Sequence, residues 1–152
     1  MLTKAVLLMK KVVLIAILSF CGILSACYEE NDSVPSTVQL LAGNDAFGKG
    51  WKITGIEVSG LGKLSPFDCT ADNNIIYYPN GRHEVSEGYE KCDPNDPPAY
   101  VGSWSFNSPK DSLFITLGDS VRSWYVDALT QTSMRLTSRF DSDKRTYVFA
   151  RR

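Results

Sequence analysis

Histidine is almost absent from this chain, and so is any excess of charge of one sign. The chain has one histidine, and its 16 basic and 17 acidic residues give a formal charge of −1. A nucleic-acid-binding domain carries a clustered basic surface, so the charge balance excludes that class. A zinc site normally needs several histidine or cysteine ligands, so we expect no metal centre of that kind. With 152 residues, the chain has room for one domain.

The motifs of common enzymes and cofactor sites are missing as well. There is no Gly-x-Ser-x-Gly motif for a catalytic serine. Gly48-Lys49-Gly50 lacks a third glycine and precedes a strand rather than a helix, so it is not a dinucleotide loop. His83 lies beside Glu84, and adjacent strand residues face opposite ways, so we expect an exposed histidine and no dyad. The sequence therefore predicts a protein that is not an enzyme and has no cofactor.

Long hydrophobic runs are limited to one, Val12 to Leu24, which has 13 uncharged residues. A membrane-spanning helix needs roughly 20. Lys10 and Lys11 precede the run, and this arrangement is typical of a secretory signal peptide. We assign residues 1–26 to the signal peptide, and Met9 is an alternative natural start. The alternative function for the run is a plain membrane anchor.

The signal region ends in Leu24-Ser25-Ala26-Cys27, which resembles the lipobox of bacterial lipoproteins. The resemblance implies that Cys27 is acylated and becomes the mature N-terminus. Residues 27–37 would then be a flexible, lipidated tether. The mature chain would have 13 basic and 17 acidic residues, a charge of −4, so lipid chains rather than basic residues would hold it to the membrane. An ordinary secreted protein is the alternative.

The resemblance also indicates a cell-envelope location, anchored in the outer membrane at its periplasmic face or at the cell surface. Glu29, Glu30 and Asp32 follow the lipobox closely and resemble an acidic export signal of surface lipoproteins. The alternative is a solvent-exposed linker that carries no sorting signal. Cys69 and Cys92 remain, and in an exported chain we expect them to form a disulfide between two loops. A metal or redox pair is the other interpretation, but no CxxC spacing supports it.

From Trp51 onward the hydrophobic pattern alternates with a period of two, which predicts strands. A short helix over 38–42 precedes them, with Ser36 or Thr37 as N-cap and Gly43 at its end. Asn80-Gly81 predicts a tight hairpin in which both residues have positive φ. Two long loops, 59–73 and 88–99, carry the two cysteines. The predicted strands are Trp51–Val58, Asn74–Tyr78, Arg82–Glu87, Tyr100–Asn107, Ser112–Leu117, Val121–Leu129, Ser133–Ser138 and Lys144–Arg151.

Eight sequential strands without crossover helices predict an all-β, eight-stranded antiparallel up-and-down barrel after a short N-terminal helix. Leu40 to Gly43, Gly50 to Thr54, Tyr78 to Gly81 and Gly102 to Phe106 resemble segments of small lipocalin-like lipoproteins. The resemblance covers residues 38–152, which we assign to one lipocalin-like barrel domain. It implies a non-enzymatic binding module for a small apolar or glycan-like ligand.

The interior decides between two functions. Aromatic residues recur on the inward phase of the strands, so the barrel holds either a solid core or a shallow apolar pocket. In the second case the candidate ligand contacts are Trp51, Tyr77, Trp104 and Trp124. In the first, the domain would be an accessory subunit that contacts another envelope protein through its loops, with an apolar patch around Tyr89, Pro97, Pro98 and Tyr100.

Two polar groups in the loops could offer oxygen ligands to calcium, although neither has EF-hand spacing. The prolines beside the second group favour a plain rigid loop, so we assign no metal. The two groups are Asp68, Asp72 and Asn73, and Asp93, Asn95 and Asp96.

Overall fold

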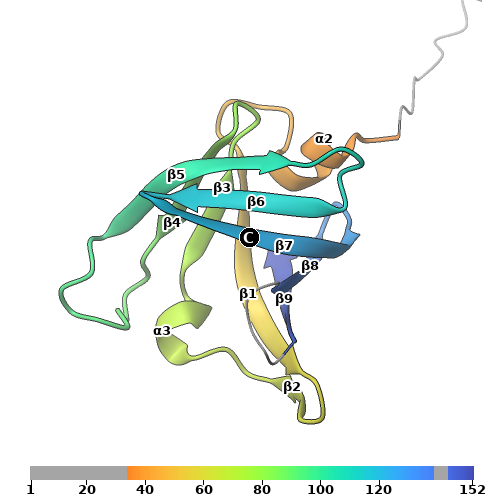
Figure 1. The fold of residues 1–152 in the computed structure, drawn as a ribbon. Coiled ribbons are helices and arrows are strands. Elements are labelled where there is room, and N and C mark those ends of the chain that lie inside the picture. The colour runs from red at the N-terminus through yellow and green to blue at the C-terminus, as the bar shows by residue number, and fades with distance from the viewer. Residues whose placement is uncertain (1–33, 139–143) are drawn as a thin grey trace, which may run out of the picture. The chain divides into compact units, whose positions relative to one another are not determined.

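The structure is a computed structural model that describes residues 34–138 and 144–152. The described strands form one antiparallel sheet, in which β1 also pairs with β9 so that the sheet closes on itself (Figure 1). This confirms the predicted antiparallel barrel. The strands are β1 (Lys49–Val58), β2 (Gly62–Leu64), β3 (Asn74–Tyr77), β4 (Arg82–Ser86), β5 (Ala99–Phe106), β6 (Ser112–Leu117), β7 (Ser120–Leu129), β8 (Ser133–Ser138) and β9 (Arg145–Arg151).

β2 lies outside the closed barrel. The first residues of β1, 49–51, pair with β3, whereas its last residues, 56–58, pair with β2. β9 pairs with β1 from Trp51 to Val58, with a register shift between Ile53 and Gly55. Eight strands, β1 and β3 to β9, therefore make the barrel, and β2 extends one edge of β1.

The eight predicted strands are all present, and β6 and β8 have the predicted bounds. The loop predicted over 59–73 was wrong in part, because it contains β2 and the short helix α3 (Asp68–Ala71). All three residues of β2 are exposed. Gly62, its first residue, and Gly60, two residues before it, have positive φ. An exposed strand has no buried face, so it leaves no alternation in the sequence.

The β3–β4 hairpin forms at the predicted place but with a different turn. Only Gly81 has positive φ, at 85°, whereas two positive values were predicted. The backbone N–H of Gly81 donates to the Tyr78 carbonyl, which closes a turn with Pro79 inside it. Proline has a fixed negative φ, which favours a type I turn followed by one left-handed residue. The side chain of Asn80 accepts a hydrogen bond from the N–H of Arg82 at 3.0 Å instead of adopting that conformation.

The predicted helix is present as α2 (Thr37–Ala42). Ser36 and Gln39 form a reciprocal capping box, and Gly43 ends the helix with φ of 78°. α2 covers the end of the barrel where β1 begins, and its Leu41 and Ala42 are fully buried. We call this the closed end of the barrel. In the part of the chain that the structure describes, no helix is long and apolar enough to span a membrane.

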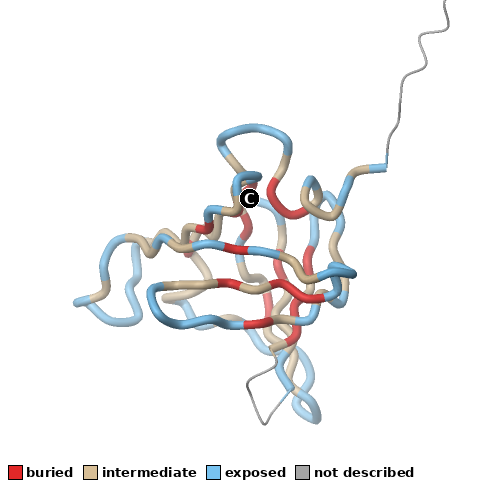
Figure 2. Tube along the Cα trace, turned by 45° about the horizontal axis from the view of Figure 1, so that its top comes forward, coloured by how far each residue is buried: buried red, intermediate tan, exposed pale blue. Residues whose placement is uncertain are grey.

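Burial follows the predicted alternation along the strands, with buried segments separated by exposed ones (Figure 2). One hydrophobic cluster packs α2 against the inner face of the barrel. Its buried members are Leu41, Ala42, Trp51, Tyr77, Trp104, Leu113, Ile115, Met134, Leu136 and Phe149.

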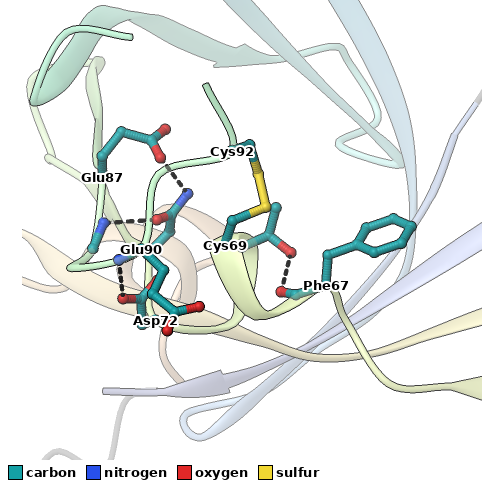
Figure 3. Close-up of a disulfide and its surroundings, with 9 residues drawn as sticks. Phe67, Cys69, Asp72, Glu87, Glu90 and Cys92 are labelled. Carbon is teal, nitrogen blue, oxygen red and sulfur yellow. Dashed lines mark hydrogen bonds between the residues drawn. A yellow bond between two sulfur atoms is a disulfide. The ribbon is translucent and has the colours of Figure 1, made fainter. Parts of the chain in front are cut away.

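Cys69 and Cys92 form a disulfide, which confirms the predicted pairing (Figure 3). It joins α3 to the loop between β4 and β5, with the two Cα atoms 5.0 Å apart. The carboxylate of Asp72 accepts hydrogen bonds from the backbone N–H groups of Tyr89 and Glu90, at 2.6 and 3.2 Å. The bridge and these hydrogen bonds fix the two long loops to each other.

Candidate ligand cavity

A cavity of about 230 Å³ lies inside the barrel next to the hydrophobic cluster, and four residues of the cluster form part of its wall. Seven of the eight barrel strands contribute side chains to its wall, and β5 contributes none. Most of the wall is aliphatic or aromatic. The lining residues are Ile53, Ile75, Tyr77, His83, Val85, Ile115, Leu117, Arg122, Trp124, Leu136, Tyr147 and Phe149.

The closed end is packed solid by aromatic rings. Trp51 is 0% exposed and Trp104 is 7% exposed. Trp104 makes edge-to-face contacts with Tyr77 and Phe106, at centroid distances of 6.0 and 5.5 Å. Such edge-to-face pairs are a favourable arrangement of aromatic rings. These rings are the floor on which the cavity ends.

Both of these indoles have hydrogen-bonded N–H groups. Nε1 of Trp51 donates to the Leu41 carbonyl at 2.9 Å, and Nε1 of Trp104 donates to the Tyr78 carbonyl at 3.0 Å. Lys49 adds a third contact of this kind, because its Nζ donates to the Leu40 carbonyl at 2.6 Å. Burial, and secondarily the charge of Arg151, lowers the pKa of Lys49. The last carbonyls of α2 are thus satisfied by side chains of β1.

The opposite end of the barrel, where the β6–β7 turn lies, gives access to the cavity; we call it the open end. Arg122 is exposed there and lines the cavity. It also borders two surface hollows of about 470 and 540 Å³, which share wall residues with the cavity. Arg122 therefore places one cation at the mouth, while the inner wall is uncharged.

His83 is the most unusual residue of the cavity wall. It is 2% exposed, so the prediction of an exposed strand histidine was wrong. Its phase on β4 is that of Val85, another wall residue, so its side chain points inward. The ring packs against Tyr77 at a centroid distance of 4.8 Å. Burial lowers the pKa of His83 to about 4, so the imidazole is neutral near pH 7.

Among the residues that the structure describes, neither nitrogen of His83 has a hydrogen-bond partner, and the same is true of Nε1 of Trp124. All three atoms are buried. Trp124 packs edge-to-face on Tyr147, with centroids 5.2 Å apart, and against the hydrophobic cluster. The cavity therefore carries unpaired polar atoms on an otherwise apolar wall, whereas the floor has its indole groups paired.

The four candidate ligand contacts separate into two pairs. Tyr77 and Trp124 line the cavity, while Trp51 and Trp104 lie in the packed floor and are absent from the wall. Sequence reasoning treated His83 as an exposed strand residue rather than a ligand contact, and it did not single out Arg122. The signal for His83 was its spacing of two from Val85 on a strand with an apolar inward phase.

The loop residues considered for metal and protein contacts have other partners. Asn73 accepts a hydrogen bond from the N–H of Gly88 at 2.8 Å, and Asp72 accepts from the N–H groups of Tyr89 and Glu90. Among residues 34–138 and 144–152, no group of three or more His, Cys, Asp or Glu side chains is placed to hold a metal ion.

The two tyrosines of the predicted apolar patch differ in their surroundings. Tyr89 is 97% exposed, whereas the hydroxyl of Tyr100 donates to Asp96 at 2.7 Å. That hydrogen bond is the main cause that raises the pKa of Tyr100 to about 12.

A solved structure shares this architecture. It is the crystal structure of a lipocalin-like protein from Bacteroides uniformis ATCC 8492, with a TM-score of 0.52 and 11% sequence identity. The match covers 73% of this chain and 97% of that chain. No protein-family model and no curated protein sequence matches the chain. The likeness shows the fold: the described chain is an eight-stranded antiparallel, lipocalin-like barrel.

Proposed function

We propose that this barrel is a non-enzymatic binding module for a small apolar ligand, which enters at the open end. The observation that carries the proposal is the cavity of about 230 Å³ inside the barrel. Eight-stranded barrels of this kind are just wide enough either to be filled by side chains or to hold one small ligand. Here the floor is filled and the remainder is hollow.

The size and chemistry of the cavity limit the ligand. An apolar cavity of about 150 Å³ in another protein holds benzene, whereas drug-sized ligands use pockets of about 300–1,000 Å³. A molecule of one or two rings fits the volume between these limits. A glycan-like ligand carries a hydroxyl on most of its carbons, and burying these against an aliphatic wall would leave many of them unpaired. The cavity therefore favours an apolar ligand over a glycan, and a binding module over a solid accessory subunit.

Filling the cavity tests the proposal directly. In Val85→Phe the added ring enters the space, because Val85 lines the wall. We expect calorimetric titration with 2-methylnaphthalene to show binding to the wild type and at least a tenfold loss in the variant. Val34→Phe is the matched control, since Val34 is 90% exposed and lines neither the cavity nor the two hollows at its mouth. Absence of binding of both 2-methylnaphthalene and its hydroxyl counterpart 2-naphthol to the wild type would contradict the proposal.

We also propose that the barrel is tethered to the outer membrane through lipid on Cys27, a residue outside the described part of the chain. The support is the lipobox-like sequence Leu24-Ser25-Ala26-Cys27 and the short polar segment that follows it. Multiple acyl chains give stable anchoring where a single chain is marginal. Cys27→Ala should move the protein from the membrane fraction to the soluble fraction with an unchanged thermal melt, and persistent tight membrane binding would disprove the anchor.

A further inference from the structure

We propose that the natural ligand carries one uncharged polar group, of the hydroxyl type, which His83 holds inside the cavity with Trp124 as a second donor. This inference rests on the proposed function and names the chemistry of its ligand: a small neutral alcohol or phenol with an apolar body. The argument starts from the unpaired atoms of the cavity wall.

Buried polar atoms of native proteins are almost always hydrogen-bonded, and each exception calls for an explanation. Nδ1 and Nε2 of His83 and Nε1 of Trp124 are three such exceptions, and both residues line the one cavity. In the floor, by contrast, buried indole N–H groups are paired, because those of Trp51 and Trp104 donate to backbone carbonyls. Within the described residues, Asp72 Oδ1 and Asn74 Oδ1 are buried and unpaired as well, but they do not line the cavity, so the three nitrogens are the unpaired buried atoms of its lining residues.

The chemistry of the three atoms specifies the polar group. A neutral imidazole has one N–H donor and one nitrogen acceptor, and an indole has one donor. A hydroxyl can both accept from such a donor and donate to the imidazole acceptor. A carboxylate can only accept, and it would be desolvated beside an imidazole that burial keeps neutral. The cation Arg122 is at the mouth, so it cannot compensate a charge on the inner wall.

The volume sets the apolar part of the ligand. About 230 Å³ accommodates one or two rings, and the wall around His83 is provided by side chains such as Ile75, Val85 and Ile115. A ligand of this class buries its ring against them and presents one hydroxyl to the imidazole. Pockets built mostly from apolar side chains with few polar groups commonly fix a ligand's orientation in this way.

Three probes with the same two-ring body separate the alternatives. At pH 7, 2-naphthol offers a neutral hydroxyl, 2-methylnaphthalene offers none, and 2-naphthoate offers an anion. The measured quantity is the ratio of the affinities for 2-naphthol and 2-methylnaphthalene, because the ratio cancels the contribution of the rings. We expect His83→Leu to lower this ratio about tenfold, the order of one hydrogen bond. His83→Gln, which keeps a donor and an acceptor, should retain most of the ratio.

Controls make the result specific to the polar atoms. Ile75→Leu alters the same wall without a polar change and should leave the ratio within twofold of wild type. Trp124→Phe removes the third unpaired atom and should lower the ratio severalfold, which keeps the test available if His83→Leu does not fold. Calorimetry on the wild type with 2-naphthoate should show the weakest binding of the three probes.

The failures can be told apart. If neither neutral probe binds the wild type, both this inference and the proposed function are wrong. If both bind and the ratio is the same in wild type, His83→Leu and Trp124→Phe, the unpaired atoms are served by water, and only this inference is overturned. Tightest binding of 2-naphthoate would place the polar group at Arg122 and would also overturn it.

Discussion

The two ends of the barrel treat the same kind of side chain in opposite ways. At the closed end, the Trp51 indole donates to the last turn of α2 and is fully buried. Toward the open end, Trp124 lines a cavity and its indole N–H has no partner in the described part of the chain. A buried hydrogen-bonded indole contributes to stability, whereas a buried unpaired one costs free energy. The difference indicates that the closed end stabilises the barrel, and it supports the proposal that the cavity side binds a ligand.

Lys49 at the closed end and His83 on the cavity wall show the same contrast between a hydrogen-bonded and an unpaired nitrogen. Lys49 at the closed end bonds a helix carbonyl and lies 4.7 Å from the centre of the Trp51 ring. His83 on the cavity wall packs on the Tyr77 ring, and neither of its nitrogens is hydrogen-bonded within the described residues. Substitutions at the closed end should therefore lower the stability strongly, whereas substitutions on the cavity wall should mainly change ligand binding.

The largest effect is expected at Trp51. Trp51→Ala removes a fully buried ring and the hydrogen bond to Leu41, and truncation of a buried tryptophan typically costs about 3–5 kcal/mol. That is a large share of the roughly 5–15 kcal/mol that a domain has. Urea unfolding should show the loss as a lower midpoint. Trp124→Ala is the control and should cost clearly less, because its ring already borders empty space; equal losses would contradict the separation of the two ends.

The strands could be predicted because each has one buried face, and burial of alternate residues leaves a period of two. β6 shows this well, since its inward residues Leu113, Ile115 and Leu117 alternate with residues of the other face. The cap was also readable, because Ser36, Gln39 and Gly43 are local signals whose partners are three or four residues away.

The cavity could not be predicted, because its volume is the difference between the space enclosed by eight strands and the side chains that fill it. Pattern alone put Trp51 and Trp124 on the same inward phase and could not assign one to the floor and one to the wall. His83 was misjudged for the same reason: a histidine on an inward phase requires a hollow beside it, and the hollow is a property of the whole barrel. β2 was missed since it buries nothing.

The disulfide ties α3 to the β4–β5 loop on the open side of the barrel, where α3 buries none of its residues. Cys69 and Cys92 are 23 residues apart, and closing a loop of this length should stabilise by about 3 kcal/mol on the chain-entropy model. Replacing both cysteines with serine should lower the free energy of unfolding by about that amount. Mass spectrometry with and without reductant checks the bond itself. An unchanged urea midpoint in the double variant would show that Asp72 and Asn73 hold the loops without it.

Acid should weaken the protein through His83. Its pKa is about 4 in the folded state against 6.5 for a free histidine, so between these values the unfolded chain binds more protons. Stability therefore rises with pH across this window and is lost as pH falls from about 6.5 to about 4. The full loss is roughly 3 kcal/mol, at 1.36 kcal/mol for each unit of pKa difference. Urea unfolding at pH 7 and pH 4 measures it.

His83→Leu is the control for that measurement, because carboxylates also titrate in this range. Glu57 is one of them, since its hydrogen bond to Arg135 is the main cause that lowers its pKa. The variant retains the carboxylates and lacks the imidazole, so the difference between its acid sensitivity and that of the wild type isolates His83. Equal sensitivity would mean that the imidazole titrates normally, as an exposed histidine does.

The smallest effect is the sharpest test of the comparison between the two ends. Trp51→Phe and Trp124→Phe are the same chemical change, yet only Trp51 donates a hydrogen bond from its indole, to Leu41 at 2.9 Å. Leaving that buried carbonyl unpaired should cost about 1–3 kcal/mol. Trp124→Phe removes an N–H that has no partner and keeps a ring facing Tyr147, so its free energy of unfolding should stay within about 1 kcal/mol of wild type. Urea unfolding of both variants measures the two costs side by side. Equal costs would show that the Trp124 indole is hydrogen-bonded in solution. The proposed difference between the packed floor and the cavity wall would then not hold for Trp124.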